Sequence, residues 1–176
     1  DLETLGVRAG CKILSIGAVV FSPEGLGAEF YTEVQRKVQG SLLEDARTLG
    51  WWALQSAEAR ERLFDNQDAK PSLSRALEQF NTWLREVAPV DDKGHLDVCV
   101  WGNGAAFDNA VLHAAYEAVA IEPPAWEFWN DRCYRTLKSL APQIKLVRVG
   151  VHHNALDDAK SQAEHAVRIL ESLKAW

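Results

Sequence analysis

Residues 12–21 (KILSIGAVVF) constrain the fold of this 176-residue chain more than any other segment. They are rich in β-branched residues and end at the sequence Ser-Pro-Glu-Gly, after which residues 29–34 (EFYTEV) alternate between polar and apolar side chains. Two such runs with a proline- and glycine-containing turn between them predict an antiparallel β-hairpin. We therefore expect a hairpin in the first part of the chain.

Helical patterns follow the hairpin. Residues 42–64 show a helical pattern that is broken at Gly50 and restarts at Ser56, which predicts two short helices. Pro71 and Ser72 then open an amphipathic helix, because apolar residues recur after them at helical spacing. These apolar residues are Leu73, Leu77, Phe80 and Leu84.

The second half of the chain alternates between strand and helix patterns. Residues 96–101 (LDVCVW) form a short apolar run, which predicts a strand buried on both faces. Helices are expected over residues 106–120 and 155–173. Between them, residues 126–136 are aromatic, and the chain is then expected to be helical through Leu140. Together these patterns predict an α/β domain with a mixed sheet, in which antiparallel hairpin strands precede parallel strands and helices flank the sheet.

The composition favours one globular domain spanning residues 1–176. Hydrophobic residues make up 47% of the chain, yet no apolar run approaches the length of a membrane span, so we expect no membrane partner. Three cysteines without C-x-x-C spacing favour a reduced, cytoplasmic compartment. The formal charge of −6 argues against nucleic-acid binding by a basic surface alone, unless bound cations offset it.

Two acidic residues, Asp1 and Glu3, stand in the opening string DLETLG. On a strand, side chains two residues apart project from the same face, so both carboxylates can approach one cation. Gly6 allows the backbone to turn tightly beside a ligand. The alternative interpretation is an acidic segment without a site.

Asp108 follows the predicted strand 96–101 and a glycine-flanked loop, which places it near the first turn of the next helix. Loops that leave the carboxyl ends of strands are where α/β folds assemble ligand sites. A carboxylate that merely stabilises the helix N-terminus is the alternative.

His153 and Asp158 lie at the start of the last predicted helix, in the string HNALDD. The histidine stands just outside this helix and the aspartate in its first turns, so both can face one cleft. The neighbouring Asp157 would point about 100° away. On spacing alone, a histidine beside His152 also fits a polar loop residue without a catalytic role.

These five residues make chemical sense together. Four carboxylates neutralise two Mg²⁺ or Mn²⁺ ions, which suits two-metal phosphodiester chemistry. A histidine with a pKa near neutrality can accept a proton from water. Scattered cysteines disfavour thiolate-rich zinc chemistry. The set comprises Asp1, Glu3, Asp108, His153 and Asp158.

Aromatic and apolar residues near these motifs offer walls or wedges for unstacked bases, with core packing as the alternative. The candidates are Leu5, Trp51, Trp52, Phe107 and Trp129. Leu5 and Phe107 are favoured because they lie beside Glu3 and Asp108.

The ordered motifs DLETLG, WGNGAAFDN and HNALDDA resemble those of the DEDDh branch of the DnaQ-like 3′–5′ exonucleases. The stretches WWALQSAEAR and FWNDRCYRT look similar to the phage exonuclease A type and to related exonuclease VIII-like proteins. The resemblance implies a ribonuclease-H-like fold. In that fold the first motif ends a central strand, so the resemblance also implies that a strand precedes Asp1.

The resemblance further implies a role for each site residue. Asp1 would bridge both metals, Glu3 and Asp158 would hold the metal that carries the attacking water, and Asp108 would support the second metal. His153 would be the general base. The 3′-terminal nucleotide would lie in a pocket lined by Thr4, Leu5 and Phe107.

The sequence thus predicts a metal-dependent 3′–5′ exonuclease that releases 5′-mononucleotides from single-stranded DNA or RNA ends, with DNA slightly favoured. One alternative is a catalytically silent nucleic-acid-binding module. Another is a phosphodiesterase that acts on small nucleotides or capped ends. Dimers occur among relatives, and the surplus of aromatic residues would supply a homodimer interface.

Overall fold

The computed structural model describes residues 1–174 of the chain. Within this part, a three-stranded antiparallel sheet has the order β1 (Leu2–Thr4), β2 (Ile13–Ser22) and β3 (Gly25–Glu33). A parallel pair joins β4 (Val100–Gly102) to β5 (Asp131–Cys133). Antiparallel hairpin strands followed by parallel strands agree with the predicted mixed sheet.

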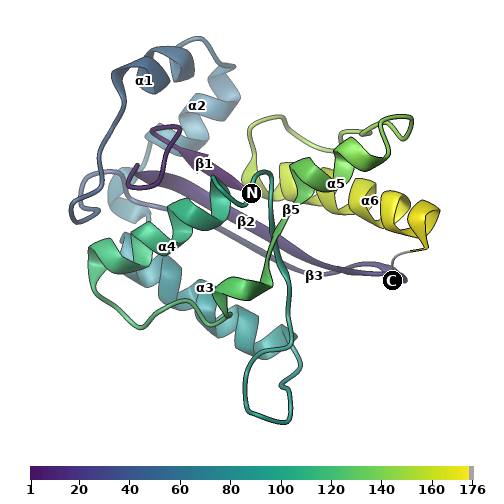
Figure 1. The fold of residues 1–176 in the computed structure, drawn as a ribbon. Helices are drawn as coiled ribbons and strands as arrows, with labels where there is room; N and C mark the ends of the chain where they lie inside the picture. Colours follow the sequence, from purple (N-terminus) through teal and green to yellow (C-terminus); the bar gives the residue numbers. More distant parts are fainter. Residues whose placement is uncertain (175–176) are drawn as a thin grey trace.

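The β2–β3 hairpin confirms the first prediction from the sequence, although β3 begins at Gly25 and is longer than expected. Its ladder runs from Ser15 opposite Glu33 to Ser22 opposite Gly25, with a register shift between Val19 and Phe21. The long hairpin crosses the molecule in Figure 1 and lies between the two helical groups described below.

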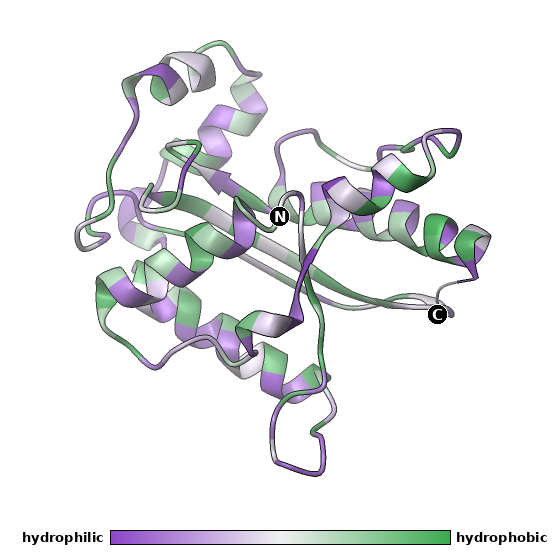
Figure 2. Cartoon of the chain, in the orientation of Figure 1, coloured by the Kyte–Doolittle hydropathy of each residue, from purple (hydrophilic) through white to green (hydrophobic). Residues whose placement is uncertain are grey.

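Two pairs of helices pack against the hairpin. The helices α3 (Leu73–Val87) and α4 (Asp108–Val119) share the largest hydrophobic core with β1 and β2. The helices α5 (Tyr134–Leu140) and α6 (Ala155–Leu173) share a second core. Figure 1 shows the two pairs on opposite sides of the N-terminus. Their colouring in Figure 2 alternates between hydrophilic and hydrophobic, as expected for amphipathic helices that bury one face.

The two short helices predicted over residues 42–64 are present as α1 (Ala46–Trp52) and α2 (Ala57–Phe64). Ser56 caps α2 as predicted, because its hydroxyl accepts a hydrogen bond from the Ala59 N–H. The predicted break at Gly50 is wrong: Gly50 lies inside α1. A helix tolerates glycine at a modest cost, and the real interruption comes after Trp52.

The predicted strand over residues 96–101 is largely wrong. Only Val100 to Gly102 form a strand, and Cys99 is exposed. β4 pairs with β5 on one edge, while its other side faces a cavity of about 540 Å³ that is also lined by β2 residues from Ile16 to Phe21. Without a partner on both edges, the preceding residues do not continue the sheet.

The helices α3, α4 and α6 match the sequence closely, whereas α5 begins only at Tyr134 and so covers the last part of the segment expected to be helical. Ser72 caps α3 by accepting a hydrogen bond from the Arg75 N–H at 3.3 Å, and α6 has the predicted bounds. The strand β5, inside the aromatic stretch, was not predicted. None of the helices in the described part of the chain combines the length and apolarity that crossing a bilayer requires.

Candidate active site

The first two acidic residues lie on or beside β1, which pairs antiparallel with β2. The Asp1 ammonium donates to the Gly17 carbonyl at 2.8 Å, and the Gly17 N–H donates back to the Asp1 carbonyl at 3.0 Å. The Asp1 carboxylate also accepts a hydrogen bond from Gln162 Nε2 at 2.7 Å. Strand pairing and this side-chain contact fix Asp1 at the edge of β2.

Asp158 reaches the same place from α6. A Cβ atom added to Gly17 would lie 2.2 Å from the backbone of Ala155, so glycine allows the start of α6 to cross β2 closely. This crossing brings Asp158 to β1. One carboxylate oxygen from each of Asp1, Glu3 and Asp158 lies within 4.8 Å of the other two. The predicted convergence of these three residues is therefore present.

Asp108 is the first residue of α4 and is 4% exposed. Its approach to β4 depends on Gly102, where an added Cβ would lie 2.8 Å from the Asp108 Cβ. Oδ2 of Asp108 is buried and has no hydrogen-bond partner among the described residues. Such an orphaned buried oxygen is costly unless a ligand satisfies it.

His153 stands in the turn before α6 with a positive φ of 63°. Few non-glycine residues adopt this conformation, and they gather at functional sites. Its Nδ1 lies 4.0 Å from Oε1 of Glu3. The rings of Trp51 and Trp52 meet the imidazole edge-on, with centroid distances of 4.8 and 5.8 Å. The predicted general base is thus held next to the acidic cluster.

The electrostatics of the cluster favour a bound cation. Burial, followed by the nearby Asp158 carboxylate, raises the pKa of the Glu3 carboxyl from 4.5 to about 8. Burial also raises the pKa of Asp108. Carboxylates crowded in a low-dielectric site need protons or cations, and oxygen ligands suit hard divalent ions such as Mg²⁺ or Mn²⁺. The donor set therefore fits the predicted metals.

The imidazole of His153 is kept neutral. Burial, and after it the charge of His152, lowers the pKa of His153 below its ordinary value. A neutral imidazole has a free nitrogen that accepts a proton, as a general base requires.

A cleft of about 830 Å³ opens beside the acidic cluster. Thr4 and Phe107 line it, in agreement with their expected place in the pocket wall. Leu5 does not: it is fully buried in a core cluster with Leu14 and Trp52, because side chains alternate along the chain that leaves β1. A direct substrate contact by the Leu5 side chain is therefore not supported by its position.

The two adjacent tryptophans have different surroundings. Trp51 is 43% exposed and lines the cleft, whereas Trp52 is 2% exposed and donates from Nε1 to the Thr4 carbonyl at 2.9 Å. Trp129, the last aromatic candidate, lies outside the cleft lining and is 57% exposed. Both tryptophans border the cleft, but only the ring of Trp51 is substantially exposed, because Trp52 is almost entirely buried.

Two residues at the site were missed by the sequence reasoning. Gln162 lies four residues after Asp158, so helical spacing alone could have placed it on the same face of α6. Arg148 donates a hydrogen bond to Oδ1 of Asp158 from the irregular segment before α6. No spacing rule identifies an arginine in such a segment.

Comparison with known proteins identifies related domains. Residues 1–170 match the family model of the Rv2179c-like 3′-5′ exoribonuclease domain. The chain is 25% identical over 162 residues to an exodeoxyribonuclease of Enterobacteria phage T4, an alignment that covers 77% of this chain and 67% of that protein.

Solved structures show the same fold. The nuclease domain of 3′hExo, a DEDDh family member bound to rAMP, has a TM-score of 0.63 and 13% identity, covering 96% of this chain and 90% of that one. Cell-death related nuclease 4 (CRN-4) has a TM-score of 0.65 and 14% identity, covering 98% and 62%. These similarities confirm the predicted arrangement of a mixed sheet flanked by helices.

Proposed function

The chain belongs to the Rv2179c-like family of 3′–5′ exonucleases, and on that premise we propose that it uses two Mg²⁺ or Mn²⁺ ions to release 5′-mononucleotides from single-stranded ends. Its membership also confirms the resemblance to DEDDh-type, DnaQ-like exonucleases and their ribonuclease-H-like fold.

One observation carries the metal dependence. Oxygens of Asp1, Glu3 and Asp158 lie within 4.8 Å of one another, and the buried Oδ2 of Asp108 has no hydrogen-bond partner within residues 1–174. Four carboxylates carry about four negative charges, which two divalent cations offset. Asp1, Glu3, Asp108 and Asp158 would hold these ions. Bound divalent ions supply Lewis-acid activation of the scissile phosphate and lower the pKa of water.

The protein residues supply proton transfer and positioning. His153 accepts the proton of the attacking water, because its imidazole is neutral at physiological pH and lies 4.0 Å from the Glu3 carboxylate. Trp51 and Trp52 hold the ring from one side, which restricts its orientation. Gln162 holds the Asp1 carboxylate and so preserves the spacing of the cluster.

The cleft receives the 3′-terminal nucleotide. Thr4 and Phe107 line the part next to the acids, and Trp51 offers an exposed ring on which a base can stack. Stacking on an aromatic ring contributes about 1–3 kcal/mol per base in single-strand binders. Arg8 and Arg47 also line the cleft and supply positive charge for the phosphate backbone.

We propose that both DNA and RNA are substrates. The matching family model is described as an exoribonuclease domain, and the phage relative is an exodeoxyribonuclease. A slight preference for DNA stays a prediction from the sequence. Its test is the side-by-side digestion of single-stranded DNA, single-stranded RNA and duplexes of the same sequence.

The test of the function itself uses a 5′-labelled single-stranded oligonucleotide incubated with Mg²⁺ or Mn²⁺. We expect stepwise shortening from the 3′ end and release of 5′-mononucleotides, with no digestion in the presence of a chelator. An oligonucleotide with a blocked 3′ end serves as the control and should persist. Internal cuts, or equal digestion of the blocked oligonucleotide, would rule out the proposed polarity.

A further inference from the structure

We propose that His152, His153 and Asp158 form an inhibitory site for a transition-metal ion of borderline softness, which overlaps the catalytic set at His153 and Asp158, with Zn²⁺ as the expected ligand. His152 has no part in the proposed catalytic set, and its side chain is exposed. Inhibition by this site rests on the proposed exonuclease function. Binding of the ion does not, because it depends only on these three side chains.

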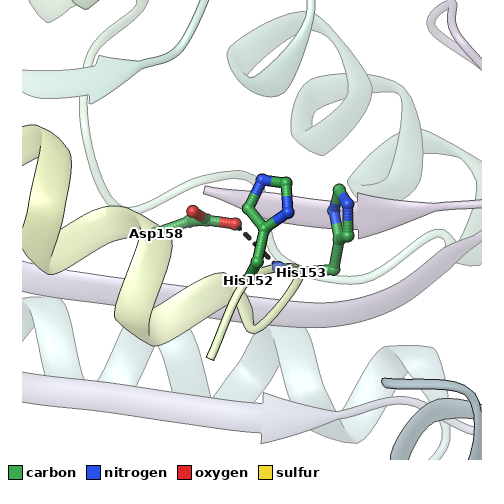
Figure 3. Close-up of side chains that lie close together, drawn as sticks. All are labelled: His152, His153 and Asp158. Carbon is green, nitrogen blue, oxygen red and sulfur yellow. Dashed lines mark hydrogen bonds between the residues drawn. The ribbon is translucent and has the colours of Figure 1, made fainter. Parts of the chain in front are cut away.

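The three side chains converge at the turn before α6. One ligand atom from each residue lies within 4.8 Å of the other two. The two imidazole rings lie side by side, with centroids 3.8 Å apart and planes inclined by 39°. Figure 3 shows both rings beside the Asp158 carboxylate, which also accepts a hydrogen bond from the His153 N–H at 3.2 Å.

The first turn of α6 holds this arrangement in place. The Asp157 carboxylate accepts a hydrogen bond from the Val151 N–H at 2.8 Å. Gly150, with a φ of 68°, packs so closely that an added Cβ would lie 2.3 Å from the same carboxylate. The backbone of the two histidines is therefore positioned before any ion arrives, and the exposed His152 side chain needs only a rotation to complete a site.

The donor set selects against the catalytic metals. Two imidazoles and one carboxylate, with one open position, match the ligands that zinc uses in open sites. Imidazole suits zinc, copper and nickel, while Mg²⁺ and Mn²⁺ prefer oxygen and bind nitrogen sites more weakly. The all-oxygen set of Asp1 and Glu3 and the nitrogen-rich set of His152 and His153 thus favour different ions.

The zinc site is inhibitory because it shares His153 and Asp158 with the catalytic set. A His153 nitrogen bound to zinc cannot accept a proton from the attacking water. Asp158 cannot bind the catalytic ions fully while it binds zinc. Its hydrogen bond with Arg148 competes with both kinds of metal ion for the same carboxylate. Zinc should therefore inhibit digestion that is supported by Mg²⁺, and a zinc chelator should restore it.

Binding is tested where the oxygen set cannot contribute. Zn²⁺ is titrated by calorimetry into the Asp1→Asn/Glu3→Gln variant and into the same variant carrying His152→Ala. We expect the first to bind one ion and the second to bind it at least about tenfold more weakly. Co²⁺ is a second probe, because its visible absorption becomes stronger when it moves from octahedral water to a four-coordinate protein site. Equal Zn²⁺ affinity in both variants would overturn the proposal.

Inhibition is tested in the otherwise unchanged chain. The assay is run at pH 8, where the His153 imidazole is neutral with or without the charge of His152, so His152→Ala should keep its Mg²⁺-dependent digestion. The zinc concentration that halves the rate should rise by at least about tenfold. The control is His95→Ala, another exposed histidine, whose neighbour is Asp91 at 3.6 Å. It should remain as zinc-sensitive as the parent. If zinc binding needs His152 but the protein has no nuclease activity, the zinc site is supported and the proposed function is contradicted. If the protein is an active nuclease whose zinc binding does not depend on His152, the proposed function is supported and the zinc site is contradicted.

Discussion

The guanidinium of Arg148 donates a hydrogen bond to Oδ1 of Asp158, within the group of carboxylates that would hold the metal ions. The arginine side chain is 53% exposed, and the aspartate side chain is 12% exposed. In this arrangement Arg148 neutralises one of the charges that attracts a cation. Because it is half-exposed, the same guanidinium can turn towards a phosphate when a cation takes its place.

Arg148→Gln should strengthen metal binding. A half-exposed ion pair contributes about 0.2–1 kcal/mol, so its loss should raise Mn²⁺ affinity by up to about fivefold. Binding of a single-stranded oligonucleotide should weaken, because one phosphate partner is lost. Calorimetric titration of Mn²⁺ checks the first effect, and Arg85→Gln, which removes the remote ion pair with Glu122, is the matched control. Weaker Mn²⁺ binding in Arg148→Gln would show that the arginine supports the metal site.

The metal-free protein should lose stability as the pH rises. The folded state raises the pKa of Glu3 from 4.5 to about 8, so the protonated carboxyl is the favoured form in the fold. The cost of ionising it is absent below pH 4.5 and grows until the pH passes about 8. Divalent ions offset this cost. Consequently, the rise in melting temperature on adding Mg²⁺ should be larger at pH 8 than at pH 6.

Thermal melts with and without Mg²⁺ across this pH range provide the measurement. Glu3→Gln should flatten the pH dependence of the metal-free protein, because the titrating group is gone. A Mg²⁺ effect on the parent that is the same at every pH would contradict this explanation.

The two neighbouring tryptophans should separate function from stability. Trp51→Ala should weaken oligonucleotide binding by about 1–3 kcal/mol if a base stacks on its ring, with little change in unfolding. Trp52→Ala should lower the free energy of unfolding by about 3–5 kcal/mol, because this ring fills the core beside β1. Urea unfolding and oligonucleotide titration of both variants check this. Equal effects of the two variants would show that Trp51 is also a core residue.

Substitution by alanine should have opposite effects on stability at Gly17 and Gly50. Gly17→Ala forces a methyl group to within 2.2 Å of the α6 backbone, so α6 must move and Asp158 must leave Asp1. We expect loss of stability and of metal affinity together. Gly50→Ala adds a methyl group in open space inside α1 and should stabilise the protein by about 0.4–1 kcal/mol. Urea unfolding compares the two, and unchanged Mn²⁺ affinity in a folded Gly17→Ala variant would contradict the proposed role of this crossing.

The sequence predicted the elements with strong periodicity. The hairpin, α3 and α6 follow from alternation and helical spacing, and the order of the acidic motifs identified residues that do converge in space. The sequence could not show that Gly50 stays within a helix, or that the segment before Val100 lacks a partner strand. Both depend on packing against distant residues.

The direction in which individual side chains point could not be predicted from the sequence either. Trp51 and Trp52 are adjacent, and only the fold decides which ring enters the core. Leu5 was expected in the pocket for its closeness to Glu3 in sequence, yet it points to the opposite side. The strand expected before Asp1 stays a prediction.

The most direct measurement is the digestion of a labelled single-stranded oligonucleotide by Asp158→Asn in Mg²⁺. We predict loss of digestion with a normal thermal melt, because the substitution removes a metal ligand without changing the shape of the side chain. Asp68→Asn, whose side chain is 90% exposed on the surface, should digest like the parent protein. Full activity of a folded Asp158→Asn variant would contradict the central claim that this carboxylate cluster performs the reaction.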